Sequence, residues 1–297
     1  MGNIFEITVV AADEFWAEQQ INTAINEIKR IEALLTTFNE ESETNYINRY
    51  AGIKPVQVSN EVFQLIKRSL NISHITDGAF DISYGSLDKK FWNFDKNMTA
   101  LPDAVRAKER VRLINYRNIL LDEATHSVLL REKGMRIGFG GIGKGYAAEK
   151  AKELLIKNGV KNGLINASGD LAAWGIQANN KPWVIGISNP DFPAATIASL
   201  NISNKAVATS GNYEKYVIIE GKKYSHTIDP KTGFPVSGIK STTVIAPHAE
   251  IADALATPVT IMGIKTGVRL IDQLPGIECI IIDDFNNIYC SKNIHLK

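Results

Sequence analysis

Two short segments in the last quarter of the chain carry side chains suited to chemistry. The first, His226-Thr-Ile-Asp229-Pro-Lys-Thr-Gly233, places an imidazole near a carboxylate in a turn that Pro230 and Gly233 favour. The second, Asp253-Ala-Leu-Ala-Thr257, is Ala-rich and helix-prone, so its carboxylate and hydroxyl should lie on one helical face. Hard oxygen ligands of this kind suit Mg²⁺, which takes one or two carboxylates and completes its shell with phosphate and water. Together the two segments indicate a base and a metal ion at a phosphoanhydride.

The composition excludes several classes of protein. Of the 297 residues, 44% are hydrophobic and 22% are charged, which is ordinary for a globular protein with a substantial core. The 33 Lys and Arg residues balance 32 Asp and Glu residues without a long run of one sign, so we expect no nucleic acid partner. No apolar run is long enough to span a membrane, and the first residues lack a basic segment followed by an apolar one.

Hydrophobic periodicity indicates strands joined by short turns, with amphipathic helices packed on them. Residues 4–12 are predicted as a strand, followed by a helix that Asp13 caps, and a second helix should start at Asn60 and end before Gly78. The polar segments 38–44 and 77–81 are predicted as functional turns outside the core. Paired strands are expected over 119–139, further strands at 163–167, 183–188, 197–202, 215–220, 240–246 and 277–282, and helices at 103–115, 145–158 and 251–273. This order favours an α+β fold with mainly antiparallel sheets in one domain, residues 1–297.

The two cysteines flank a predicted turn at 283–287. Cys279 and Cys290 could therefore face each other across a hairpin and form a disulfide. We favour two buried thiols, because two cysteines do not make a disulfide framework. Their spacing does not suit a metal site.

A glycine-rich loop at 138–145 satisfies two nucleotide-binding patterns only in part. Gly138-Phe-Gly140-Gly-Ile-Gly143 fits G-x-G-x-x-G, but no βα series precedes it, and the nearest strand-end acid, Asp170, lies more than twenty residues past Gly143. The P-loop pattern continues through Lys144, yet Gly145 stands where a P-loop needs Ser or Thr. The loop could still bind a phosphate through backbone N–H groups and Lys144, or be a turn with a solvated lysine.

Taken in order, eight segments of the chain resemble the ApbE family of flavin transferases, the FAD:protein FMN transferases. The resemblance covers nearly the whole chain. The segments are Met1-Gly, Ser42-Glu-x-x-x-Ile-Asn48, Gly78-Ala-Phe-Asp81, Gly140-Gly-Ile-Gly-Lys144-Gly-Tyr146, Asn166-Ala-Ser-Gly-Asp170, Ala208-Thr-Ser-Gly-Asn-Tyr213, His226-Thr-Ile-Asp-Pro-x-Thr-Gly233 and Ala252-Asp-Ala-x-x-Thr257.

The resemblance implies a two-lobed α+β fold that binds FAD in a cleft between the lobes, with Mg²⁺ on its pyrophosphate. The implied metal ligands are the side chains of Asp253 and Thr257 and the backbone carbonyl of Gly143. The implied flavin contacts are Met1, Phe38, Ala79, Phe80, Asp81, Lys144, His226 and Ile228.

In the implied reaction, a Ser or Thr hydroxyl of an acceptor protein attacks the flavin-side phosphorus of FAD and AMP leaves. Such a hydroxyl needs a base, and His226 suits that role at neutral pH. The resemblance points to a redox-complex subunit or a flavin reductase as acceptor. A Mg²⁺-dependent FAD pyrophosphatase, giving FMN and AMP, and a non-catalytic flavin-binding protein are the alternatives.

Several of these residues also have ordinary structural interpretations. Asp229 could orient His226, although we favour a turn bond from Thr232. Asp253 and Thr257 could simply cap and line a helix. In the same way, Asp81 could be only a cap, and the two phenylalanines at 38 and 80 could be core residues.

The chain departs from the family pattern at three positions. Gly138 replaces an aspartate of the cofactor site, Gly143 replaces an alanine, and Ser168 replaces the first glycine of a Gly-Gly-Asp turn. Many relatives also carry a lipoprotein leader before the Met-Gly strand. We therefore expect a cytoplasmic protein if the chain starts at Met1, and a periplasmic or lipid-anchored one if a leader precedes it.

Overall fold

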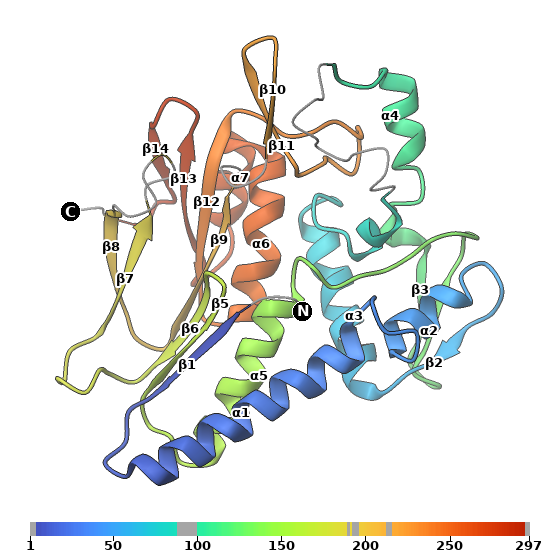
Figure 1. Cartoon of the computed structure of the whole chain (residues 1–297). Coiled ribbons are helices and arrows are strands. Elements are labelled where there is room, and N and C mark those ends of the chain that lie inside the picture. The colour runs from blue at the N-terminus through green and yellow to red at the C-terminus, as the bar shows by residue number, and fades with distance from the viewer. Residues whose placement is uncertain (1–3, 88–99, 189–190, 192–195, 212–215, 295–297) are drawn as a thin grey trace.

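A seven-stranded antiparallel sheet forms the larger part of the protein. The computed structural model describes residues 4–87, 100–188, 191, 196–211 and 216–294 (Figure 1). Every pair of neighbouring strands in this sheet is antiparallel, as the short predicted connections required. In spatial order the strands are β1 (Phe5–Val9), β5 (Gly163–Ala167), β6 (Asp170–Trp174), β9 (Lys205–Gly211), β12 (Ile239–Ala246), β13 (Glu278–Asp283) and β14 (Ile288–Cys290).

Helices cover one face of this sheet, and a two-stranded ribbon covers the other (Figure 1). The helices are α1 (Glu14–Leu35), α5 (Gly143–Lys157), α6 (Ala249–Met262) and α7 (Ile264–Ile271). The ribbon consists of β7 (Trp183–Ser188) and β8 (Thr196–Ile202), which bury Ile187 and Ile202 against the sheet. Together with the ribbon, the sheet and these helices form the sheet lobe.

A second group of elements, the helical lobe, lies beside the sheet lobe. It contains α2 (Glu43–Arg49), α3 (Asn60–Ile75), η1 (Ile82–Ser86), α4 (Ala104–Arg110), η2 (Tyr116–Asn118) and the small sheet β2 (Val56–Gln57), β4 (Ser127–Leu130) and β3 (Ile119–Asp122). The hairpin β10 (Tyr216–Ile219) and β11 (Lys222–Ser225) packs Val217 near α4. The largest buried cluster joins the lobes, because it includes Phe63 of α3 and Ile165 of β5.

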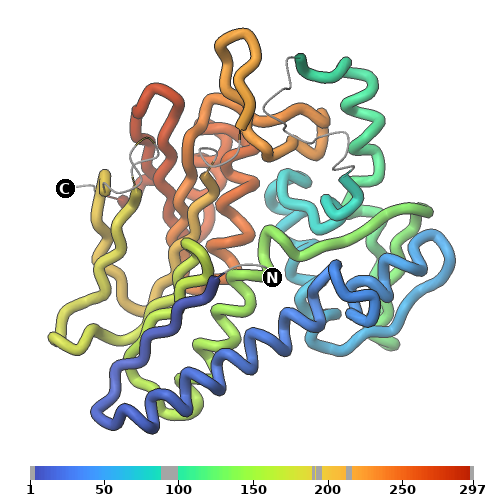
Figure 2. The backbone as a smooth tube through the Cα atoms, in the orientation of Figure 1, coloured from blue at the N-terminus to red at the C-terminus, as the bar shows by residue number. Residues whose placement is uncertain are grey.

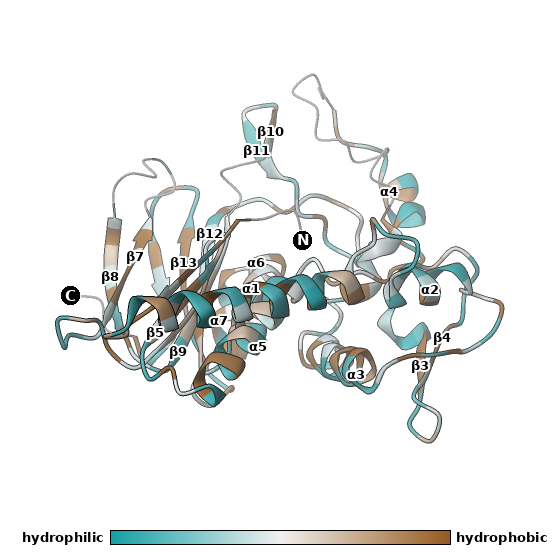
Figure 3. Cartoon of the chain, turned by 60° about the horizontal axis from the view of Figure 1, so that its bottom comes forward, coloured by the Kyte–Doolittle hydropathy of each residue, from teal (hydrophilic) through white to brown (hydrophobic). Residues whose placement is uncertain are grey.

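The path of the chain explains how the lobes meet. In Figure 2 the backbone leaves the sheet lobe after β1, runs along α1 into the helical lobe, and returns through α5. Asp13 caps α1 as predicted, since its carboxylate accepts the Trp16 N–H at 3.1 Å. The buried face of α1 carries Ala24, Ile28, Ile31 and Leu35, while hydrophilic residues lie along much of its outer side (Figure 3).

Several expectations about local structure are wrong. The paired strands predicted over 119–139 end at Leu130, the last residue of β4. The single helix predicted over 251–273 is two helices, because Gly263, at φ +78°, ends α6 before α7 begins. The segment 77–81 reaches the interior, where Ala79 and Phe80 are buried. The polar segment 38–44 already contains the start of α2, which Ser42 caps.

The cysteines are free and do not face each other. Residue 280 pairs with Cys290, so Cys279 and Cys290 point to opposite faces of the sheet and join different buried clusters. In the described part of the chain, no helix combines the length and apolar character needed to cross a bilayer.

Candidate functional site

A cleft of about 1530 Å³ opens between the lobes, and most of the predicted site residues line it. Its walls come from the end of α1, from segment 79–87, from the glycine-rich loop before α5, and from the ends of β6, β7 and β9. The predicted residues on its surface are Phe38, Ala79, Phe80, Asp81, Gly143, Lys144, His226, Asp253 and Thr257. Tertiary structure therefore brings together segments that lie more than two hundred residues apart in the sequence.

The two remaining predicted residues are Ile228 and Met1. Ile228 is fully buried and packs in the cluster with α4. Its N–H donates to the hydroxyl of Tyr84 at 3.1 Å, and Tyr84 does line the cleft. Met1 lies outside the described residues, but Ile4 bonds to Ser168 through both backbone groups, and Ser168 also lines the cleft.

Acidic and hydroxyl groups gather where α5 meets α6. The Asp253 carboxylate is buried and accepts the Gly145 N–H at 2.9 Å. Thr257 lies one turn along α6, and its hydroxyl donates to Ser210 at 3.3 Å. Ser210 belongs to a quoted motif, yet sequence reasoning gave it no role.

Lys144 and Asp170 complete this group. The Lys144 ammonium lies 2.5 Å from the Asp170 carboxylate, so the alternative of a solvated lysine is wrong. Burial raises the pKa of Asp170, and Lys144 opposes this effect. Burial, and then the charge of Asp170, raise the pKa of Asp253 to about 7.

These groups fit a hard cation. Asp253, Thr257 and Ser210 offer one carboxylate and two hydroxyls, and Gly143, at the start of α5, lines the same cleft. Within the described ranges, no three His, Cys, Asp or Glu side chains gather as a metal site. A cation held mainly by one carboxylate and completed by other oxygens is the arrangement typical of Mg²⁺ with phosphates.

His226 is exposed at the cleft. The carboxylate of Asp229 accepts its hydrogen bonds from two residues of its own turn. The two oxygens of Asp229 accept the Lys231 N–H at 2.8 Å and the Thr232 hydroxyl at 2.9 Å. This supports the turn interpretation of Asp229. Gly233, at φ +74°, is required here, because a Cβ would overlap the carbonyl of Ala107.

The other predicted flavin contacts differ in their surroundings. Asp81 caps η1, and its oxygens accept from Ser83 and from the Tyr116 N–H, so the cap interpretation accounts for its bonds. Phe80 is a core residue that also lines the cleft. Phe38 is 92% exposed at the cleft, which rules out the alternative that it is a core residue.

The glycine-rich loop is neither of the two nucleotide-binding motifs. The segment before it forms no strand, and the large sheet is antiparallel, so the Rossmann arrangement is excluded. Gly145 cannot be Ser or Thr, because a Cβ there would overlap the carbonyl of Ala249 on α6. The contact between two helices therefore explains the residue that breaks the P-loop pattern.

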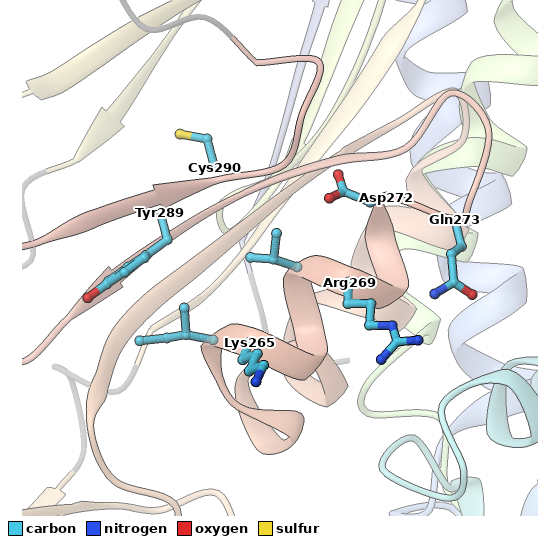
Figure 4. A pocket seen from close by; sticks show the side chains of 8 residues that line it. Lys265, Arg269, Asp272, Gln273, Tyr289 and Cys290 are labelled. Carbon is cyan, nitrogen blue, oxygen red and sulfur yellow. The ribbon is translucent and has the colours of Figure 1, made fainter.

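A second, smaller hollow lies between α7 and β14, away from these residues (Figure 4). It has a volume of about 470 Å³ and contains none of the predicted site residues. Its lining includes Lys265, Arg269 and Tyr289.

Fold and cleft together define a two-lobed α+β protein with a buried group of oxygen ligands in a large inter-lobe cleft. The model of the ApbE family matches residues 1–281, so the chain belongs to the ApbE family. The family that the eight segments resembled is thereby confirmed.

Individual relatives agree with this assignment. The chain is 35% identical over 272 residues to an FAD:protein FMN transferase of Klebsiella pneumoniae (strain 342), covering 91% of this chain and 84% of that protein. A protein of the same name from Treponema pallidum is 29% identical, with 93% and 81% covered. The crystal structure of the ApbE protein from Thermotoga maritima matches with a TM-score of 0.87 at 30% identity, covering 98% of this chain and 94% of that one.

Proposed function

We propose that this protein is an FAD:protein FMN transferase, which moves FMN from FAD to a Ser or Thr hydroxyl of an acceptor protein and releases AMP. The names of its relatives support this activity. The observation that carries the proposal is that one cleft holds both His226 and the oxygen group around Asp253. At about 1530 Å³, the cleft exceeds the roughly 300–1,000 Å³ of common small-molecule pockets, so it has room for a dinucleotide.

Asp253, Thr257 and the Gly143 carbonyl are the proposed Mg²⁺ ligands. When bound, Mg²⁺ would neutralise charge that builds on the phosphoryl oxygens. Ser210 lies within reach of Thr257 and orients its hydroxyl. The ion pair with Asp170 positions the Lys144 ammonium near Asp253, where the phosphates of FAD are proposed to bind.

His226 is the proposed general base, which accepts the proton of the acceptor hydroxyl. Its exposure at the cleft suits this role, because a large protein substrate must bring its hydroxyl to the imidazole. Lys144, together with the cation when it is bound, would stabilise the charge on the departing AMP.

The flavin half of FAD is assigned to the wall formed by Phe38, Ala79, Phe80 and Asp81. Phe38 offers an exposed ring, and Ala79 and Phe80 offer a buried apolar surface. Met1 keeps its assignment by resemblance. Ile228 is reassigned as a support, since it acts through the Tyr84 hydroxyl rather than by direct contact. The acceptor class, a redox-complex subunit or a flavin reductase, also rests on the resemblance.

The test is to incubate the protein with FAD, Mg²⁺ and a candidate acceptor and to weigh the acceptor by mass spectrometry. A mass increase of one FMN, with release of AMP, is expected. Release of FMN and AMP with an unchanged acceptor would identify a pyrophosphatase instead. Binding of FAD without any product, across a panel of acceptors, would identify a flavin-binding protein.

A further inference from the structure

Helices α5 and α6 each lack a cap from their own segment. Ile142 and His248 occupy the cap positions, and neither side chain bonds a backbone N–H of its helix. The first N–H groups of a helix have no partner within the helix, so these two buried ends need acceptors from elsewhere.

Each of the two helices takes that acceptor from the other. Glu149 of α5 accepts the Ala249 N–H at the start of α6, at 2.7 Å. Asp253 of α6 accepts the Gly145 N–H at the start of α5, at 2.9 Å. Gly145 and Glu149 are four residues apart on α5. Their partners on α6, Asp253 and Ala249, are also four residues apart but run in the opposite direction. At 1.5 Å per residue, the two bonds are therefore about 6 Å apart along the contact.

The close approach depends on Gly145. A Cβ at this position would overlap the Ala249 carbonyl, and it would stand 2.7 Å from the Cβ of Asp253. The first turns of α5 and α6 therefore meet backbone to backbone. A shift of either helix start would therefore affect both bonds, because both bonds join the same two closely packed first turns.

Glu149 is a well-supported anion in this contact. It is only 4% exposed, and Lys152 at 2.6 Å and His248 at 3.0 Å flank its carboxylate. Burial favours the neutral acid, but the bonds from Lys152, His248 and Ala249 outweigh it and hold the pKa of Glu149 below its usual range. A charged carboxylate at a helix start is also favoured by the helix dipole.

We propose that Glu149 is a positioning residue for the Mg²⁺ and phosphate site: by fixing the start of α6, it holds Asp253 against the start of α5. This inference rests on the proposed function, since it concerns the same site. Glu149 itself does not line the cleft, so its effect on the cation passes through Asp253.

The test compares Glu149→Gln with Glu250→Gln in the full chain. Glu250 is the matched control, because it lies in the first turn of α6, next to the Ala249 N–H that Glu149 accepts. It is 7% exposed, and its substitution also removes an ion pair, here to Arg68. The first measurement is amide hydrogen exchange over residues 143–147 without ligand. The second is the Mg²⁺ concentration that gives half of the full FAD binding in a fluorescence titration.

In Glu149→Gln, exchange at the start of α5 should accelerate about tenfold. Half-saturation should need about ten to twenty times more Mg²⁺, at the lower end of the range for groups that support metal ligands. Saturating Mg²⁺ should restore FAD binding. Glu250→Gln should lower the melting temperature without either change. If Glu149→Gln does not fold, Glu149→Asp, which keeps the charge but shortens the reach, should show both changes at smaller size.

Two results would overturn the inference, and they are distinguishable. If the wild-type protein binds FAD in a Mg²⁺-dependent way, and the Glu149 variants match it in exchange and in Mg²⁺ demand, the residue is merely structural and the proposed function stands. If the wild-type protein binds FAD equally well with and without Mg²⁺, both the proposed metal site and the positioning role of Glu149 are contradicted.

Discussion

The Lys144 ammonium and the Asp170 carboxylate form a 2.5 Å ion pair at the start of α5, beside a second buried acid, Asp253. The pair leaves Lys144 unable to neutralise Asp253 fully, and the pKa of Asp253 stays raised by burial and by Asp170. A site with two buried acids and one lysine is short of positive charge. A cation that binds with phosphate would correct this imbalance, and the first predictions test that idea.

Asp253→Ala should weaken Mg²⁺-dependent FAD binding and FMN transfer together. The variant removes the only carboxylate among the proposed ligands, so the loss should be at least the roughly 10–100-fold seen when groups supporting a ligand are removed. High Mg²⁺ should restore part of both. Titration of FAD with and without EDTA measures the effect, and equal affinities in the wild-type protein would contradict the metal assignment.

His226→Ala should leave FAD binding in place and slow transfer. Loss of a positioned general base should cost about 10²–10⁴-fold in rate, with partial recovery as rising pH ionises the acceptor hydroxyl. Single-turnover transfer at saturating FAD measures this. If binding is lost while the rate at saturation is unchanged, His226 is a cofactor contact, and the base lies elsewhere.

Gly138→Asp, which introduces the aspartate that the family resemblance implies, should fold normally and should not reduce FAD affinity. Gly138 has no positive φ, and a Cβ would meet Thr37 and Gly85 at 3.8 and 4.0 Å, which are ordinary contacts. The free energy of unfolding should change by less than about 0.5 kcal/mol. A clear fall in melting temperature would show that the loop needs glycine at this position.

Gly145→Ala should be destabilising by about 1–3 kcal/mol or more, because it forces α5 away from α6. Gly140→Ala is the matched control in the same loop: its Cβ would meet nothing within 4 Å, and its φ is not positive. Chemical denaturation of both variants measures the difference. Equal free energies of unfolding for the two variants would mean that α5 and α6 can move apart without loss of stability.

Acid should remove the stabilising contribution of Glu149. Its folded pKa lies below the usual 4.5, so the contribution is present above that value and is lost as the pH falls through the folded pKa. Glu149→Gln cannot titrate, although Lys152 and His248 still face the position. The wild-type protein should therefore melt at a higher temperature than the variant at neutral pH, and this difference in melting temperature should decrease below about pH 4.5. A difference that stays constant in acid would contradict the ion-pair account.

Local sequence predicted much of the secondary structure and the family. The Asp13 cap, the α3 start at Asn60 and the β7 bounds follow from caps and periodicity, which depend only on neighbouring residues. The eight ordered segments sufficed for the family, and most of the site residues that they implied line the cleft. Sequence reasoning missed β6 and β9, because their motifs look like turns rather than alternating strands.

The geometry within the site was decided only by tertiary structure. The packing of α5 on α6 decides three features of the site: the N–H group that donates to Asp253, the need for glycine at 145, and the bond between Glu149 and the start of a different helix. In the same way, the sheet register placed Cys279 and Cys290 on opposite faces, and core packing buried Ile228. Periodicity determines which face of a helix or strand is apolar. It does not determine which other element covers that face or in which register, because many elements would bury the same surface equally well.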